Sequence, residues 1–130
     1  MRPNDWPERL HDFLAARNVP FAWGPQDCVS LAADWVMALG FDDPIAPFRG
    51  YTDARSAVQA IRAAGGIASH WATALQEVPI GMARRGDLGV IHIGRREATV
   101  IVTGGEVVGA GPVGLVSLPR ARLMRAFEVG

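Results

Sequence analysis

Apolar residues in the first half of the chain recur every three or four positions, the spacing of one face of an α-helix. This pattern predicts three helices, the first from about residue 5 to 17, the second from 27 to 39 and the third from 53 to 64. Gly40 follows the second stretch, where a helix commonly ends. A short fourth helix is expected to begin with Ser69 as its cap.

After Pro79 the pattern changes to short runs of β-branched and other apolar residues separated by turns. The runs predict five strands, over Leu88 to Ile93, Ala98 to Thr103, Glu106 to Ala110, Val113 to Leu118 and Arg125 to Val129. We expect consecutive strands to pair as a meander, since Gly104 and Gly105 supply the positive φ that a tight hairpin needs. Helices followed by strands predict an α+β fold, with N-terminal helices packed on a C-terminal antiparallel β-sheet.

Length and composition are those of one globular domain. The 130 residues are 49% apolar and 20% charged, which suits one hydrophobic core, and we expect a single domain over residues 1–130. No apolar run approaches the roughly 20 residues that span a bilayer, and the first residues lack the charged-then-apolar order of a secretory signal. We therefore expect synthesis in the cytoplasm and no direct membrane insertion.

The thirteen basic and thirteen acidic residues cancel one another. A neutral chain has no general attraction for nucleic acid, so we expect no nucleic-acid partner. One cysteine excludes an internal disulfide, and three scattered histidines do not form a zinc-binding pattern. We expect neither a metal site nor a cofactor.

Cys28 is the candidate nucleophile. In the stretch FAWGPQDCVSLAADWVMALG it follows Asp27, a capping residue type, so the thiol is expected in the first turn of a helix. Unpaired amide groups at a helix start favour the thiolate, whereas the neighbouring Asp27 carboxylate opposes it. Two interpretations stay open, a nucleophile or a packed core thiol, because Cys28 also lies on the apolar face of its helix.

Several sequence blocks resemble a known family. WGPQDC before a helix and RRGDLGVI before a strand resemble the NlpC/P60 cysteine peptidases, which have a papain-like fold. In order along nearly the whole chain, FAWGPQDC, FRGY, AAGG, RRGDLGVI, GPVGLVSLP and RAFEV are similar to a family of short phage and prophage tail-module proteins distantly related to NlpC/P60. The resemblance implies an NlpC/P60-like domain carried in a phage or prophage-like tail.

The resemblance also implies where the partners of the cysteine should lie. In NlpC/P60 enzymes a strand histidine after the Gly-Asp pair accepts the thiol proton, and a second polar residue orients it. Alignment puts Ala98 and Gly109 at these two positions, and neither side chain transfers protons. Loss of a general base typically costs ~10²–10⁴-fold in rate, so a degenerate catalytic site is expected.

His92 is the candidate replacement for the missing base. A three-residue hairpin loop over residues 94–96 would pair His92 with Ala98, and we expect it then to approach Cys28. A two-residue loop starting one position later would pair it with Thr99 and turn it to the other face, because a one-residue slip reverses side-chain direction. The other interpretation is a strand histidine that faces solvent.

Four further residues are candidates for lining a cleft around the cysteine. Trp23 and Asp27 lie directly before Cys28, and Trp23 would either floor a groove or pack in the core. Arg49 and Tyr51 lie in the FRGY segment of a proline-rich loop. They would line the cleft, contact a neighbouring subunit or hold the loop in place.

The resemblance implies three alternative functions. The first, favoured by Ala98 and Gly109, is a structural tail-tip or tail-assembly protein that keeps the fold as a docking module for other tail-tip or baseplate proteins. It would reside in the host cytoplasm before assembly and in the virion tail afterwards. The second is an active cysteine endopeptidase that cleaves peptidoglycan stem peptides during genome delivery. The third is a bacterial domain that binds wall peptides without cleaving them.

Overall fold

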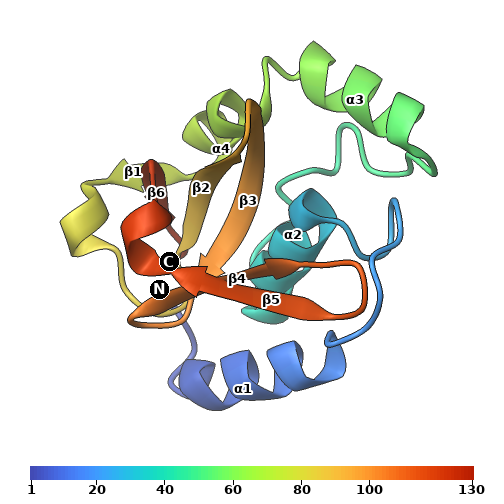
Figure 1. Cartoon of the computed structure of the whole chain (residues 1–130). Helices are drawn as coiled ribbons and strands as arrows, with labels where there is room; N and C mark the ends of the chain where they lie inside the picture. Colours follow the sequence, from blue (N-terminus) through green and yellow to red (C-terminus); the bar gives the residue numbers. More distant parts are fainter.

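Four α-helices precede the strands in this computed structural model of residues 1–130 (Figure 1). They are α1 (Trp6–Ala16), α2 (Cys28–Ala38), α3 (Ala54–Ala63) and α4 (Ile67–Ala74). Asp27 and Asp53 begin α2 and α3 with capping boxes, in which each carboxylate accepts a hydrogen bond from the amide of a serine three positions later. The first three helices therefore lie where the apolar pattern predicts them.

The fourth helix starts earlier than expected. Gly66 precedes α4 with a φ of 104°, so Ser69 lies inside the helix and does not cap it. The carboxylate of Glu97, on a strand far along the chain, accepts a hydrogen bond from the Ala68 amide at 3.3 Å. The helix start is thus satisfied by a tertiary contact, which a local sequence pattern does not contain.

Six strands form one antiparallel sheet in the order β1-β6-β2-β3-β4-β5. Their bounds are β1 (Gln76–Val78), β2 (Leu88–Ile93), β3 (Arg96–Val102), β4 (Glu106–Ala110), β5 (Leu115–Pro119) and β6 (Arg125–Glu128), with short 3₁₀ helices η1 (Ile80–Met82) and η2 (Arg120–Arg122). Strands β2 to β5 form the expected meander, but β6 returns to pair with β2, and β1 adds to β6. The sequence pattern missed β1 because it is three residues long and largely exposed.

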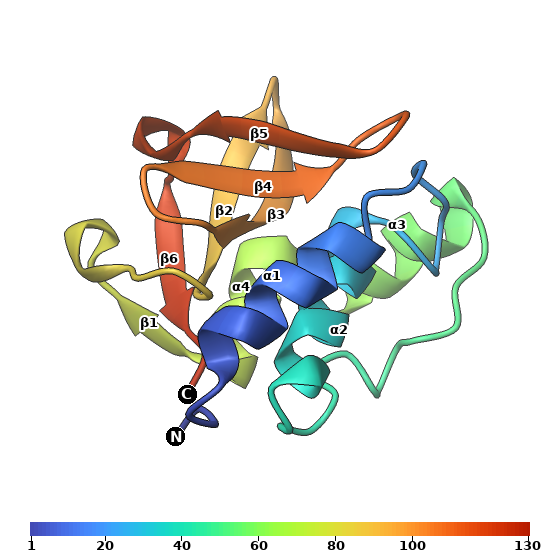
Figure 2. The same cartoon turned by 90° about the horizontal axis from the view of Figure 1, so that it is seen from below.

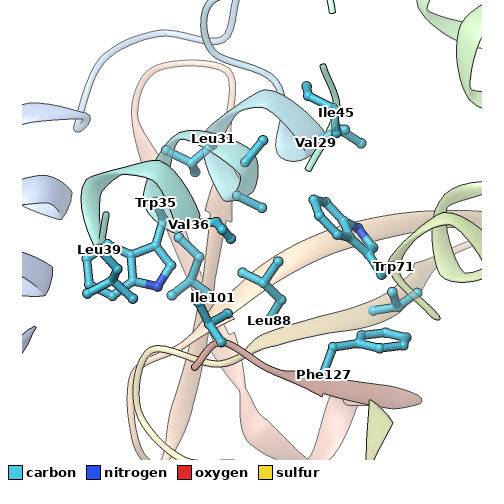
Figure 3. Close-up of a cluster of buried hydrophobic side chains, with 14 of the residues drawn as sticks. Val29, Leu31, Trp35, Val36, Leu39, Ile45, Trp71, Leu88, Ile101 and Phe127 are labelled. Atoms are coloured by element: carbon cyan, nitrogen blue, oxygen red, sulfur yellow. The ribbon is translucent and has the colours of Figure 1, made fainter. Parts of the chain in front are cut away.

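The helices pack on one face of the sheet, which confirms the predicted α+β architecture. Helix α2 is buried along most of its length, and its Leu31 and Trp35 belong to the same core cluster as Leu88 and Ile101 of the sheet (Figure 3). Trp71 of α4 and Phe127 of β6 extend this core, and the three largest fully buried side chains are Trp35, Trp71 and Phe127. Because α2 is packed tightly, the position of its first residue, Cys28, is fixed by the core.

Strands β4 and β5 turn across the β2–β3 pair, so the sheet is strongly curved (Figure 2). Strand β3 pairs with β4 only where Ile101 meets Val108 and Val102 meets Val107. The first half of β3 is therefore not covered by β4. A second apolar cluster, which includes Ile91 and Val100, fills the face of the sheet away from the helices.

The two ends of the chain lie side by side (Figure 2). Buried Arg2 donates from Nε to the Val129 carbonyl at 2.7 Å and from Nη2 to the Asp87 carboxylate at 2.6 Å. Asp87 also accepts from the Arg84 and Val129 amides, so it holds the turn before β2. Asp87 in the Gly-Asp pair is thus a structural residue.

Candidate functional site

Cys28 is the first residue of α2 and lies between two cavities. One has a volume of about 450 Å³ and lies between α2, α3 and the start of α4; Trp23, Asp27 and Cys28 border it. The other has a volume of about 180 Å³ and lies between the separated parts of β3 and β4. Only part of the cysteine is exposed. The sequence therefore placed Cys28 correctly at a helix start.

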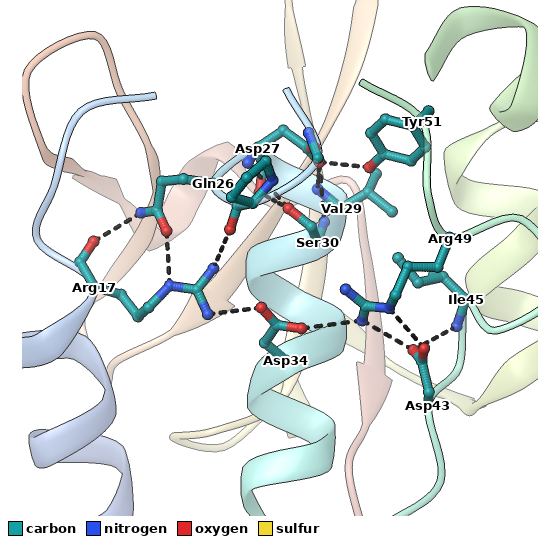
Figure 4. Close-up of polar contacts among 12 residues, drawn as sticks. Arg17, Gln26, Asp27, Val29, Ser30, Asp34, Asp43, Ile45, Arg49 and Tyr51 are labelled. Atoms are coloured by element: carbon teal, nitrogen blue, oxygen red, sulfur yellow. Dashed lines mark hydrogen bonds and ion pairs between the residues drawn. The ribbon is translucent and has the colours of Figure 1, made fainter. Parts of the chain in front are cut away.

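Asp27 holds the helix start beside the thiol, and both of its carboxylate oxygens accept hydrogen bonds from within the protein (Figure 4). One carboxylate oxygen accepts from the Val29 and Ser30 amides at 2.9 Å, and the other accepts from the Gly24 amide. The Tyr51 hydroxyl donates to the first oxygen at 2.8 Å. Asp27 is therefore a positioning residue within the wall of the larger cavity.

Tyr51 is buried in this hydrogen bond. Burial, followed by the negative charge of Asp27, raises the pKa of the Tyr51 phenol above its usual value. The phenol is neutral at physiological pH, and its proton is held by Asp27. Tyr51, one of the two FRGY residues considered for a cleft, thus holds the start of α2 through its hydrogen bond to Asp27.

Arg49 is held by two carboxylates. It forms ion pairs with Asp43 at 2.7 Å and with Asp34 of α2 at 3.0 Å, and Asp34 also binds Arg17, the residue that follows α1 (Figure 4). The side-chain hydrogen bond to Asp43 raises the pKa of Arg49 above its usual value. Arg49 borders neither cavity beside Cys28. Its observed contacts hold the loop to α2, one of the alternatives that the sequence left open.

Thr99 of β3 is the residue that faces the thiol. Its backbone and hydroxyl lie near enough to Cys28 to lower the pKa of the thiol. The hydroxyl accepts a hydrogen bond from Trp71 Nε1 at 2.8 Å. Thr99 thus lies between the indole of α4 and the thiol of α2.

The thiol is protonated at neutral pH. Burial, with a smaller contribution from the Asp27 charge, raises the pKa of Cys28 to about 11, although the neighbouring Thr99 acts in the opposite direction. The sequence did not decide whether the helix start, which favours the thiolate, or the Asp27 charge, which opposes it, has the larger effect on the thiol. The structure favours the protonated thiol because of burial, which a local sequence pattern does not reveal.

His92 does not take the position of a base. It pairs with Glu97, so both expected registers, His92 with Ala98 and His92 with Thr99, are wrong. The physical reason is a two-residue turn over Gly94 and Arg95, in which Gly94 adopts a φ of 62°. The exposed His92 side chain borders neither of the two cavities at Cys28.

The positions aligned with the catalytic partners lie beside the thiol but carry no ionisable group. Ala98 and Gly109 line the smaller cavity together with Cys28. Ala98 pairs with Ile91, whereas the next residue, Thr99, pairs with Val90 and lies on the opposite face. The β3 residue with a polar side chain near the thiol is therefore Thr99, one position after the residue that the alignment suggests.

Trp23 borders the larger cavity, which is one of the two positions that the sequence left open for it. It is 37% exposed and packs edge-on against Phe21. Three residues that the sequence did not single out, Arg62, Arg96 and Glu97, also line this cavity. They come from α3 and β3, far apart in sequence, so only the tertiary structure brings them together.

Neither a metal centre nor a membrane helix is found in the structure. No three His, Cys, Asp or Glu side chains lie close enough together to bind a metal ion. None of the helices has the length and apolar composition needed to cross a bilayer.

The fold is similar to that of a solved structure from Staphylococcus aureus, described as similar to a lipoprotein of the NLP/P60 family. The TM-score is 0.60 at 19% sequence identity. The likeness covers 98% of this chain and 42% of that chain, so the protein spans less than half the length of this structural relative. The fold class is NlpC/P60-like.

The sequence itself belongs to a particular family. A family described as "Domain of unknown function (DUF6950)" matches residues 1–129, and this chain is a member of it. No curated protein shows significant similarity to the sequence.

Proposed function

We propose that this protein is a non-catalytic NlpC/P60-like docking module, a structural component of the tail tip or tail assembly of a phage or prophage-like particle. The observation that carries the non-catalytic part is the burial of the Cys28 thiol, which raises its pKa to about 11. Cysteine peptidases attack with a thiolate. At pH 7 this pKa leaves about one thiol in ten thousand ionised.

The residues around the thiol do not supply the histidine that the resemblance implies. Ala98 and Gly109 carry no ionisable group, and a hydroxyl such as that of Thr99 does not accept a proton near neutral pH. The carboxylates of the larger cavity, Asp27 and Glu97, accept hydrogen bonds from backbone amides. Without a base the thiol is not activated and the leaving amine is not protonated, and each contribution is typically worth ~10²–10⁴-fold.

The tail assignment is supported by the order of the sequence blocks that resemble tail-module proteins, from FAWGPQDC to RAFEV. In that role the domain would bind other tail-tip or baseplate proteins. It would occur in the host cytoplasm before assembly and in the virion tail afterwards. The packed core around α2 suits a rigid docking module.

One observation favours a second candidate, an active peptidase that cleaves peptidoglycan stem peptides. Cys28 begins a helix at the edge of an open cavity of about 450 Å³, as a nucleophile would. A partner protein would then have to supply the base.

The two functions are separated by purified protein and its Cys28→Ala variant, incubated with peptidoglycan fragments with and without the other tail proteins. We expect intact fragments in every reaction. Separately, an antibody against the chain is expected to label assembled tails in electron micrographs. Cleavage that disappears in Cys28→Ala would contradict the non-catalytic proposal, and unlabelled tails would contradict the tail assignment.

A further inference from the structure

The larger cavity beside Cys28 has an apolar interior. Val58 and Ile61 of α3 and Ile67 of α4 line it, and Val58 remains 49% exposed. Its volume of about 450 Å³ falls within the ~300–1,000 Å³ range of ligand pockets. The space suits a short stretch of apolar side chains.

Two arginines border the same cavity and have no partner within the protein. Arg62 lies in the last turn of α3, and Arg96 is the first residue of β3. Neither guanidinium makes an ion pair or a side-chain hydrogen bond, in contrast to Arg17 and Arg49, which are fully engaged. A guanidinium offers a planar set of donors that matches a carboxylate.

The two acidic residues of the cavity accept hydrogen bonds from the backbone. Glu97 accepts from the Ala68 amide at the start of α4, and Asp27 accepts from three amides and the Tyr51 hydroxyl. They do not neutralise the two arginines through an ion pair. The cavity therefore combines an apolar floor with two guanidinium groups that have no ion-pair partner in the protein.

Resting on the proposed docking function, we propose that this cavity binds a peptide segment of a partner protein in which apolar side chains stand next to an acidic residue. The apolar side chains would cover Val58 and Ile61, and the carboxylate would bind Arg62 and Arg96. Glu97 would repel the ligand carboxylate from the α4 side and so fix the direction of the segment.

The test uses the full chain and three short synthetic peptides. Each contains the same leucines and alanines, and they differ in one residue, which is Glu, Gln or Lys. Isothermal titration calorimetry is expected to give at least about tenfold tighter binding for the Glu peptide than for the Gln peptide, as for a charge-assisted hydrogen bond. The Lys peptide is expected to bind most weakly.

Charge-reversal variants locate the binding site. Arg62→Glu and Arg96→Glu should each remove the preference for the Glu peptide, and the double variant should prefer the Lys peptide. Matched controls are Arg55→Glu, on the same helix, and Arg95→Glu, in the turn next to Arg96; both lie outside the cavity lining. Circular dichroism confirms that each variant is folded.

Three results overturn this inference. The first is equal binding of the Glu and Gln peptides, including no binding of either, and the second is an equal loss of preference in the control variants. The third is a peptidoglycan stem peptide that binds more tightly than the Glu peptide. These results leave the non-catalytic proposal intact, because that proposal fails only on cleavage that depends on Cys28.

Discussion

The indole of Trp71 donates a hydrogen bond to the Thr99 hydroxyl at 2.8 Å, and Thr99 lies beside the Cys28 thiol. In an enzyme of this fold a histidine would be expected to accept the thiol proton. Here the strand residue beside the sulfur is a threonine, whose hydroxyl is held by Trp71. The arrangement keeps the thiol in place as part of the packing between α2, α4 and β3.

Replacing Thr99 by Val is expected to destabilise the protein by about 1–3 kcal/mol, because the buried indole of Trp71 then has no acceptor. It should also raise the pKa of Cys28, since a donor to the thiolate is lost. Urea unfolding and the pH dependence of alkylation measure the two effects. Thr99→Ser keeps the hydroxyl and is the control. Equal stability of the Val variant and the native protein would show that the hydrogen bond from Trp71 to Thr99 contributes nothing.

The raised pKa of Cys28 predicts a loss of stability in alkali. The unfolded thiol ionises near pH 9 and the folded thiol near pH 11, so the contribution is complete below pH 9 and disappears as the pH rises to about 11. The expected size is on the order of 2–3 kcal/mol. Unfolding of native protein and Cys28→Ala across this range should show a steeper decline in the native protein, and parallel curves would contradict the shift.

Tyr51→Phe is expected to cost about 1.5–3 kcal/mol of unfolding free energy, the usual worth of a hydrogen bond to a charged group. The lost bond is the one from the phenol to the Asp27 carboxylate. A double-mutant cycle with Asp27→Asn measures the coupling between the two residues. Additive effects of the two changes would show that the bond contributes nothing.

Arg2→Ala is expected to destabilise the protein by about 3–5 kcal/mol, because it leaves the buried Asp87 carboxylate without its cation. The control is Arg9→Ala, which removes an exposed ion pair to Asp5 and should cost less than about 1 kcal/mol. Chemical denaturation of both variants gives the comparison. Similar losses in the two variants would contradict the structural role of Arg2.

Local signals in the sequence predicted the helices and the position of the cysteine. Asp27 and Cys28 are adjacent, so a capping residue type followed by an apolar helical face was enough to place the thiol at a helix start. The α+β class followed from the change of apolar period after Pro79. These features depend on neighbours in the chain.

The partners of the cysteine depend on contacts between distant segments, and the sequence did not reveal them. Whether His92 or Thr99 faces Cys28 depends on a hairpin register that one residue of slip reverses. Arg49 was a candidate for the cleft with a structural role as the alternative, and its ion pairs with Asp34 and Asp43 show the structural role. Asp43 lies six positions before Arg49 in the same loop, a spacing that could have suggested the pair.

The most direct test of the central claim is a titration of the single thiol, followed by ultraviolet thiolate absorbance in the folded protein with Cys28→Ala as the blank. The structure predicts half-ionisation at about pH 11. Half-ionisation near neutral pH or below would show an activated cysteine and would contradict the account of a protonated thiol in a non-catalytic NlpC/P60-like domain.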